Sequence, residues 1–298
     1  MAVTNFGSIN IDKIYRVSQF LQPGETRLVA GHQQSLGGKG ANQSIALAKA
    51  GSAVRHIGNI GPDGGWTAET LAAAAVDIDA IAKVQTPTGH AVIQVDDAGE
   101  NCILVDSGAN VCLTEAQISA ALTNTAASDW VLLQNETNLT GTIAAQARAA
   151  GHKVCYSAAP FVAAQTLPLL GTIDLLVVNA LEAEMLAQAL AVAVDAIPVP
   201  AMVITKGADG AVYTANRQSA QAVTVTAPAF PVEVVDTTGA GDTFLGFFLS
   251  ALETGRDPAE GLRRAAAAAA LQVTKPGAAA AIPDSATVDA FLRDHPAS

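Results

Sequence analysis

Short apolar runs alternate with longer alanine-rich segments along nearly all of the 298 residues. The apolar runs have the length of buried strands, and the segments between them carry the residues that favour helices. This alternation is typical of a mostly parallel sheet flanked by helices, so the predicted fold class is α/β. The expected core strands are 3–7, 54–57, 130–133, 153–156, 175–178 and 202–205, and the expected helices are 40–50, 65–75, 115–123, 140–150, 180–191, 240–252, 258–274 and 285–292.

Two stretches interrupt the alternation, at about 11–36 and 88–107. They combine β-branched residues with turn signals, and in the second stretch a turn at 96–99 joins two apolar runs. Strand pairs inserted at two points of an α/β core are expected to meet as a small β layer over the strand ends, in the position of a lid. Residues 1–298 are therefore predicted to form one α/β domain with inserted lid strands.

Charge and composition argue against several functions. Sixteen Lys and Arg oppose 27 Asp and Glu, and the resulting net charge of −11 repels nucleic-acid phosphates and anionic lipid head groups. The longest uncharged run, 154–173, contains two prolines, so we expect no membrane-spanning helix. The first residues lack a secretory signal pattern, which predicts a cytoplasmic location. The three cysteines and five histidines show no spacing typical of a disulfide framework or a structural zinc site.

The most informative segment is 234–244, with the sequence VVDTTGAGDTF. A β-like run ends at Asp236, a turn of small residues follows, and an apolar helix begins near Ala240. Backbone N–H groups at such a helix start favour a phosphate, and Gly239 and Gly241 let the backbone approach it. Asp242 is then either a first-turn acid that complements the helix dipole or a base held beside the anion.

A second glycine turn leads into a helix at 36–43, with the sequence LGGKGANQ. It is not a P-loop, because Gly40 rather than Ser or Thr follows Lys39. Lys39, Asn42 and Gln43 suit the hydroxyls of a sugar. The alternative is an ordinary glycine turn with solvated polar side chains.

Two further segments follow predicted strands. Asn179 and Glu182 share one side of a first helical turn, where they could either hold Mg²⁺ through water or form a capping box. Another strand ends at Thr205 and leads into a glycine turn containing Gly207 and Gly210. Taken alone, that segment is only a turn.

Together these segments resemble the ribokinase family, the PfkB-type carbohydrate kinases. The opening GSINID at 7–12, the GGKGANQ turn at 37–43, SGAN at 107–110, the N-x-x-E at 179–182 and DTTGAGDTF at 236–244 follow the family's order over nearly the whole chain. The resemblance implies a ribokinase-like fold and transfer of a phosphoryl group from ATP to a sugar's primary hydroxyl. The GGKGANQ form implies D-ribose as the acceptor. The alternatives are another sugar, a nucleoside, or a sugar-binding protein without activity.

The resemblance also implies roles for individual residues. Asp242 would be the general base, and the N–H groups of Gly239, Ala240 and Gly241 would form the anion hole. The sugar set would be Asn10, Asp12, Gly38, Lys39, Asn42, Glu136 and Asp242. Asn179 and Glu182 would organise Mg²⁺ and the phosphates, with Thr205, Gly207, Gly210 and Gly241 on the ATP side.

The family further implies activation by a monovalent cation, commonly K⁺, near the anion hole. The matching residues are Asp236, Thr238, Lys275 and Gly277. The chain departs from the family at Ala281, where a serine hydroxyl is typical and a methyl group cannot coordinate a cation. A second departure is the interval 190–202, which is too short for the family's extra helix. A homodimer joined through the lids is also expected, because the lid strands leave open edges.

Overall fold

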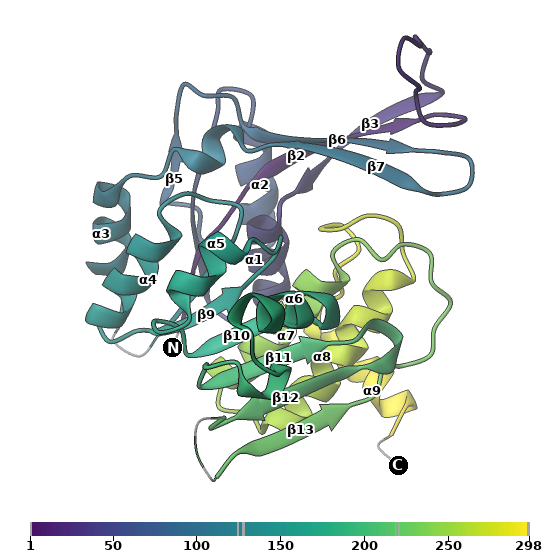
Figure 1. The fold of residues 1–298 in the computed structure, drawn as a ribbon. Helices are drawn as coiled ribbons and strands as arrows, with labels where there is room; N and C mark the ends of the chain where they lie inside the picture. Colours follow the sequence, from purple (N-terminus) through teal and green to yellow (C-terminus); the bar gives the residue numbers. More distant parts are fainter. Residues whose placement is uncertain (1, 124, 127–128, 218, 220, 297–298) are drawn as a thin grey trace.

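The computed structural model describes residues 2–123, 125–126, 129–217, 219 and 221–296 (Figure 1). Within these residues nine strands form one sheet, in the order β13-β12-β11-β10-β9-β8-β1-β4-β5, and four form another, in the order β3-β2-β6-β7. The main sheet consists of β1 (Val3–Phe6), β4 (Val54–Ile60), β5 (Ile81–Lys83), β8 (Trp130–Gln134), β9 (Lys153–Ser157), β10 (Leu175–Asn179), β11 (Ala201–Thr205), β12 (Ala211–Ala215) and β13 (Val223–Ala227). The helices are α1 (Lys39–Ala50), α2 (Gly65–Ala73), α3 (Glu115–Thr123), α4 (Thr140–Ala149), α5 (Ala163–Thr166), α6 (Ala180–Leu190), α7 (Ala240–Glu253), α8 (Pro258–Val273) and α9 (Ser285–Asp294).

The main sheet confirms the predicted α/β class. Strands β5, β4, β1, β8, β9, β10 and β11 run parallel to one another, and β12 and β13 extend the sheet at β11 through two antiparallel pairs. β1 lies between β4 and β8, with Val3 opposite both Val54 and Trp130. The chain therefore builds the sheet outward from β1 in both directions. Such a switch point is where open α/β sheets bind ligands, outside the carboxyl ends of the strands.

Both faces of the main sheet are covered by helices, as Figure 1 shows. Alternate residues of a strand point to opposite faces. Leu132 packs in one core cluster with side chains of α1, α2, α7, α8 and α9, while Leu133 belongs to a second cluster with α3, α4 and α6. Burial on both faces explains why the central strands read as continuous apolar runs.

The four-stranded sheet is built from the two stretches that interrupt the alternation. It consists of β2 (Asn10–Arg16), β3 (Gly31–Gly37), β6 (Gly89–Val95) and β7 (Asn101–Asp106). β2 pairs antiparallel with β3 and parallel with β6, so strands that lie far apart in the sequence meet as expected. In Figure 1 this sheet, which we call the lid, extends from one end of the main sheet.

Helices α1 and α7 pack closely on the same face of the main sheet. A Cβ atom at Gly246 would lie 2.4 Å from Cβ of Ala46, so only glycine permits this approach. The contact places the first turn of α1 beside the first turn of α7.

The short interval before β11 contains a single 3₁₀ turn, Val194–Ala196, in place of a longer helix. A search of the described residues found no helix long and apolar enough to cross a membrane.

Candidate active site

The predicted site residues lie at the carboxyl ends of the central parallel strands. Asn10 follows β1, Glu136 follows β8, Asn179 ends β10 and Thr205 ends β11. The first turns of α1 and α7 complete the site, and both helices begin after a glycine of positive φ, Gly38 or Gly239. The strands and helices that the sequence predicted thus bring these segments to one edge of the sheet.

Asp242 lies half-buried in the first turn of α7. Its Oδ2 accepts a hydrogen bond of 3.1 Å from Nδ2 of Asn42, and its Oδ1 accepts one of 2.8 Å from Nε2 of Gln43. Burial raises the pKa of Asp242, although Lys39 and the two amides oppose that rise. The carboxylate is therefore fixed in orientation and more basic than an exposed aspartate.

A buried polar network holds the Gln43 amide. Oε1 of Gln43 accepts a hydrogen bond of 2.7 Å from Nε2 of Gln134, which also donates to Oδ1 of Asn5 at 2.9 Å. Asn5 in turn donates to the backbone oxygen of Gly40 and to Oγ of Ser44, both at 2.8 Å. These bonds determine which end of the Gln43 amide faces Asp242.

Lys39 occupies the centre of an acidic group. Its Nζ lies 3.9 Å from Oε1 of Glu136, and Oε2 of Glu136 accepts from the Lys39 backbone N–H at 3.0 Å. Burial alone would lower the pKa of Lys39, but the surrounding carboxylates raise it above its ordinary value; these are Asp242, Glu136, Glu182 and Asp12. Lys39 therefore remains charged and compensates the acids on both sides of the site.

Asp12 lies at the base of the lid, on β2. Burial raises its pKa to about 6, with a further contribution from Glu136 and an opposing one from Lys39. A carboxylate kept in this environment suits a neutral, hydroxyl-rich ligand that donates hydrogen bonds.

Two asparagines supply further polar groups to the same space. Oδ1 of Asn10 accepts a hydrogen bond of 2.7 Å from Nδ2 of Asn110, which ties β2 to the SGAN segment. Asn42 is buried, and within the part of the chain that the structure describes its Oδ1 has no hydrogen-bond partner. A buried acceptor without a partner is costly, so this oxygen is suited to a ligand hydroxyl.

The start of α7 agrees only partly with the expected anion hole. The Ala240 N–H donates to the Thr237 oxygen at 3.2 Å, because the chain closes a turn there. The Ala240 N–H is therefore engaged within the turn, and its part in the anion hole stays a prediction. Among the described residues, the N–H groups of Gly239 and Gly241 have no partner, and Gly241 also lines the neighbouring pocket.

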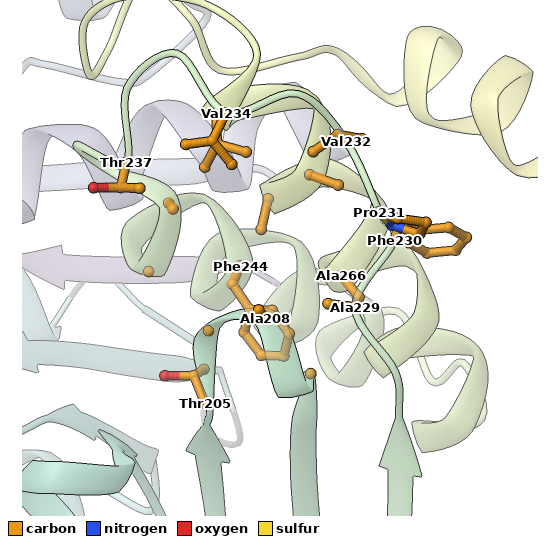
Figure 2. Close-up of a pocket in the computed structure, with 17 residues that line it drawn as sticks. Thr205, Ala208, Ala229, Phe230, Pro231, Val232, Val234, Thr237, Phe244 and Ala266 are labelled. Atoms are coloured by element: carbon orange, nitrogen blue, oxygen red, sulfur yellow. The ribbon is translucent and has the colours of Figure 1, made fainter.

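That pocket has a volume of about 560 Å³ and lies between β11, α7, α8 and the segment 229–237 (Figure 2). Thr205, Gly207 and Gly210 line it, together with Ala240 and Gly241 of α7. In Figure 2, Val232 and Val234 lie on one side of the pocket and Phe244 and Thr205 on the other. The lining is largely apolar, which suits a flat heteroaromatic ring.

Asn179 and Glu182 form the capping box that was the alternative interpretation of this pair. The Glu182 N–H donates to Oδ1 of Asn179 at 2.8 Å, and the Asn179 N–H donates to Oε2 of Glu182 at 2.9 Å. Burial raises the pKa of Glu182, although Asn179 and Lys39 act against it. The box uses one carboxylate oxygen and leaves Oε1 for another partner.

The residues expected to hold a monovalent cation are hydrogen-bonded within the protein. Oδ1 of Asp236 accepts from the Thr238 N–H at 2.9 Å, and Oδ2 accepts from the Gly277 N–H at 2.8 Å. Burial would raise the pKa of Asp236, but these hydrogen bonds lower it below its ordinary value. The Thr238 and Gly277 oxygens both accept from the side chain of Gln272. Lys275 lies in the same loop, and its backbone N–H donates to the backbone oxygen of Gln272 at 3.2 Å.

Several residues of the site carry no motif that would have singled them out. Gln134 and Asn5 come from short buried strands, where a polar residue among apolar ones is the only signal. Gln272 lies in an alanine-rich helix, and Ser8, whose Oγ donates to Oε2 of Glu136, lies within the opening motif without a predicted role. Only their positions in the fold identify them.

Comparisons with known proteins agree with this arrangement. The model of the pfkB family carbohydrate kinases matches residues 2–285. The ribokinase of Haemophilus influenzae is 39% identical, with 94% of this chain and 95% of that protein covered. The ribokinase of Staphylococcus aureus is 35% identical, with 94% and 96% covered.

Among solved structures, the ribokinase of Arabidopsis thaliana complexed with ribose and ATP superposes with a TM-score of 0.85 at 30% identity. The superposition covers 98% of each chain. The similarity therefore extends over the lid, the polar site beneath it and the pocket.

Proposed function

Since the chain belongs to the pfkB family of carbohydrate kinases, we propose that it transfers the γ-phosphoryl group of ATP to the primary hydroxyl of D-ribose. The products are ribose 5-phosphate and ADP. The observation that carries the proposal is the position of Asp242. Its carboxylate lies between the polar group under the lid and the pocket beside α7, and it is held there by Asn42 and Gln43.

Asp242 acts as the general base in this proposal. Its raised pKa makes it a better proton acceptor than an exposed aspartate, and it takes the proton of the attacking hydroxyl. A positioned base is worth roughly 10²- to 10⁴-fold in rate. The two amide hydrogen bonds keep the carboxylate aimed at the acceptor rather than at solvent.

The first turn of α7 stabilises the transferred phosphoryl group. The N–H groups of Gly239 and Gly241 are the donors, and Ala240 contributes only if its turn opens. The helix dipole favours the negative charge that develops there. Each donor in such a site is worth about 10²- to 10³-fold in rate.

Ribose is held by the polar residues under the lid. Asp12 and the free Oδ1 of Asn42 accept hydrogen bonds from sugar hydroxyls. Lys39 and Glu136 fix the rest of the ring, with Asn10 and the backbone at Gly38 beside it. The lid excludes water, which would otherwise compete with the sugar as acceptor.

ATP occupies the pocket of about 560 Å³, with its base against the apolar lining. Thr205, Gly207 and Gly210 contact the nucleotide, and Asn179 is the neighbour of Thr205 in the sheet register. Glu182 and Asn179 would hold Mg²⁺ through water. Within the described ranges, no cluster of three or more His, Cys, Asp or Glu is placed to hold a metal ion. Bound Mg²⁺ neutralises phosphate charge.

A homodimer through the lids is part of the proposal. β7 is an edge strand of the lid, and its residues Leu104 and Val105 are 69% and 62% exposed. Exposed apolar edges favour pairing with a second copy. Sedimentation at micromolar concentration should give a dimer for the natural chain and a monomer for Leu104→Glu; a monomeric natural chain contradicts the dimer.

The free thiols of Cys102, Cys112 and Cys155 support a reducing compartment, and we place the reaction in the cytoplasm.

An acceptor panel tests the function. ADP release is followed with ribose, deoxyribose, fructose, adenosine and inosine, and without any acceptor as the control for ATP hydrolysis. We expect the highest kcat/KM for ribose. A higher value for a nucleoside or another sugar contradicts the assignment of ribose, and ribose binding without ADP release contradicts the kinase function.

A further inference from the structure

The side chain of Gln272 occupies the point where the two loops behind the anion hole converge. It lies at the end of α8 and is fully buried, with 0% exposure. Its Nε2 lies within hydrogen-bond distance of three backbone oxygens, those of Thr238 at 3.1 Å, Gly277 at 3.0 Å and Ala278 at 2.9 Å, which share its two N–H donors. Three carbonyl dipoles from two separate loops therefore point at one nitrogen.

Converging carbonyl oxygens of this kind are what a K⁺ ion uses for coordination, and two of the three belong to residues expected to bind it. Here the side-chain amide of Gln272 supplies the positive charge that these oxygens face, because both of its N–H hydrogens carry partial positive charge. Each carboxylate oxygen of Asp236 already accepts one hydrogen bond, from the N–H group of Thr238 or of Gly277, so the carboxylate is engaged within the protein. Ala281 is buried at 4% exposure and presents a methyl group. The residues present therefore do not fit a bound monovalent cation.

The same amide supports the catalytic turn. A Cβ atom added to Gly239 would lie 3.4 Å from Nε2 of Gln272, so the amide packs directly against the start of α7. Oγ1 of Thr243 also donates to Oε1 of Gln272, at 3.4 Å. Gln272 thus joins the loop of Thr238, the loop of Gly277 and the helix turn that carries Gly241 and Asp242.

We propose that the Gln272 side-chain amide replaces the monovalent cation, so that the anion hole is assembled without K⁺. Gln272 is a positioning residue in this proposal, because it acts through the backbone of Gly239 and Gly241. The inference rests on the proposed kinase function for its effect on rate, but the occupancy of the site by the amide can be tested without turnover.

The first test is cation binding to the natural chain with ADP present. Thallium-205 NMR, with Tl⁺ as a K⁺ analogue and K⁺ as competitor, should show no site that K⁺ displaces. The melting temperature should not differ between potassium and tetramethylammonium salts at equal ionic strength. A saturable Tl⁺ site that K⁺ competes for, or a melting temperature that rises specifically with K⁺, overturns the proposal.

The second test is turnover with ribose and MgATP in potassium, sodium, caesium and tetramethylammonium salts. The natural chain should give the same kcat in all four. Gln272→Ala combined with Ala281→Ser reopens the cation site, so its kcat should fall about tenfold or more in tetramethylammonium, the scale of a lost hydrogen bond to a charged group. Potassium should restore it. The matched control is Gln188→Ala, at an exposed position of α6, which should behave like the natural chain.

Activation of the natural chain by K⁺ of tenfold or more overturns the proposal, as does a double variant that folds but stays equally impaired in every salt. If the double variant does not fold, thallium binding to the natural chain and the salt dependence of its kcat still test the proposal. A natural chain that phosphorylates ribose in no salt contradicts the proposed function instead, and the thallium measurement then decides the inference alone.

Discussion

Nε2 of Gln43 donates a hydrogen bond of 2.8 Å to Oδ1 of Asp242, across a separation of 199 residues in the sequence. The donor lies in the first turn of α1 and the acceptor in the first turn of α7. Their contact depends on the close packing of the two helices at Gly246. The orientation of the base is therefore a property of the helix pair and not of either motif alone.

Removal of this donor should alter the pH dependence of the reaction. Gln43→Met keeps the volume but removes a hydrogen bond that lowers the pKa of Asp242, so the pKa of the carboxyl rises further. The acidic limb of the kcat/KM profile, where the base becomes protonated, should move to higher pH. An unchanged limb, or one that moves to lower pH, contradicts the role of Gln43. Gln188→Met is the control.

Asp12 should make the free protein less stable as the pH rises. Its pKa is raised from 3.8 to about 6 by burial, so the folded state disfavours the ionised form. This cost is absent below the unfolded pKa and complete above the folded one. Asp12→Asn should therefore gain stability, by an amount larger at about pH 8 than at about pH 5 by on the order of 1 kcal/mol.

Urea unfolding at the two pH values measures this difference. Asp97→Asn, in the exposed turn at 96–99, is the control and should show no pH-dependent gain. An equal gain for Asp12→Asn at both pH values would mean that Asp12 titrates normally.

The contact between α1 and α7 should tolerate no added methyl group. Gly246→Ala places a Cβ 2.4 Å from Cβ of Ala46, and such overpacking costs about 1–3 kcal/mol. The helices separate, so both the melting temperature and kcat should fall. Gly65→Ala is the matched control, because a Cβ there meets nothing within 4 Å. A Gly246→Ala variant with natural kcat would show that the helix spacing does not set the geometry of Asp242.

Filling the apolar pocket should weaken ATP binding alone. Ala270 lines the pocket on α8, and Ala270→Leu should raise the KM for ATP about tenfold, the scale of roughly 1–3 kcal/mol for overpacking. The KM for ribose should not change. Ala280→Leu, at an exposed position, is the control. Equal effects of Ala270→Leu on both substrates would place the nucleotide elsewhere.

The central strands could be predicted because burial on both faces makes them continuous apolar runs. β12 and β13 could not, since β13 is largely exposed and its sequence, VTVTA, reads as a polar edge. The lid strands were recognised by the loss of helical periodicity in 11–36 and 88–107, not by their apolar content.

The site was predictable where a motif combines a glycine turn with polar side chains, as at Lys39, Asn42 and Asp242. The site was not predictable where a side chain or N–H group hydrogen-bonds to a backbone oxygen or to an amide that is distant in the sequence. The turn that engages the Ala240 N–H and the three oxygens around Gln272 depend on backbone geometry that residue types do not encode. Asn179 and Glu182 form the capping box that their spacing allowed, whereas their role in holding Mg²⁺ stays a prediction.

Asp242→Asn tests whether this carboxylate is the general base. The amide keeps the shape of the side chain but cannot accept the hydroxyl proton, so kcat should fall by roughly 10² or more while ribose binding is retained. The measurement is kcat at saturating ribose and MgATP, with ribose affinity determined by calorimetry on the same preparation. We expect a large loss of kcat with retained affinity for ribose. Near-normal turnover would contradict it, because Asp242 would then not be the base.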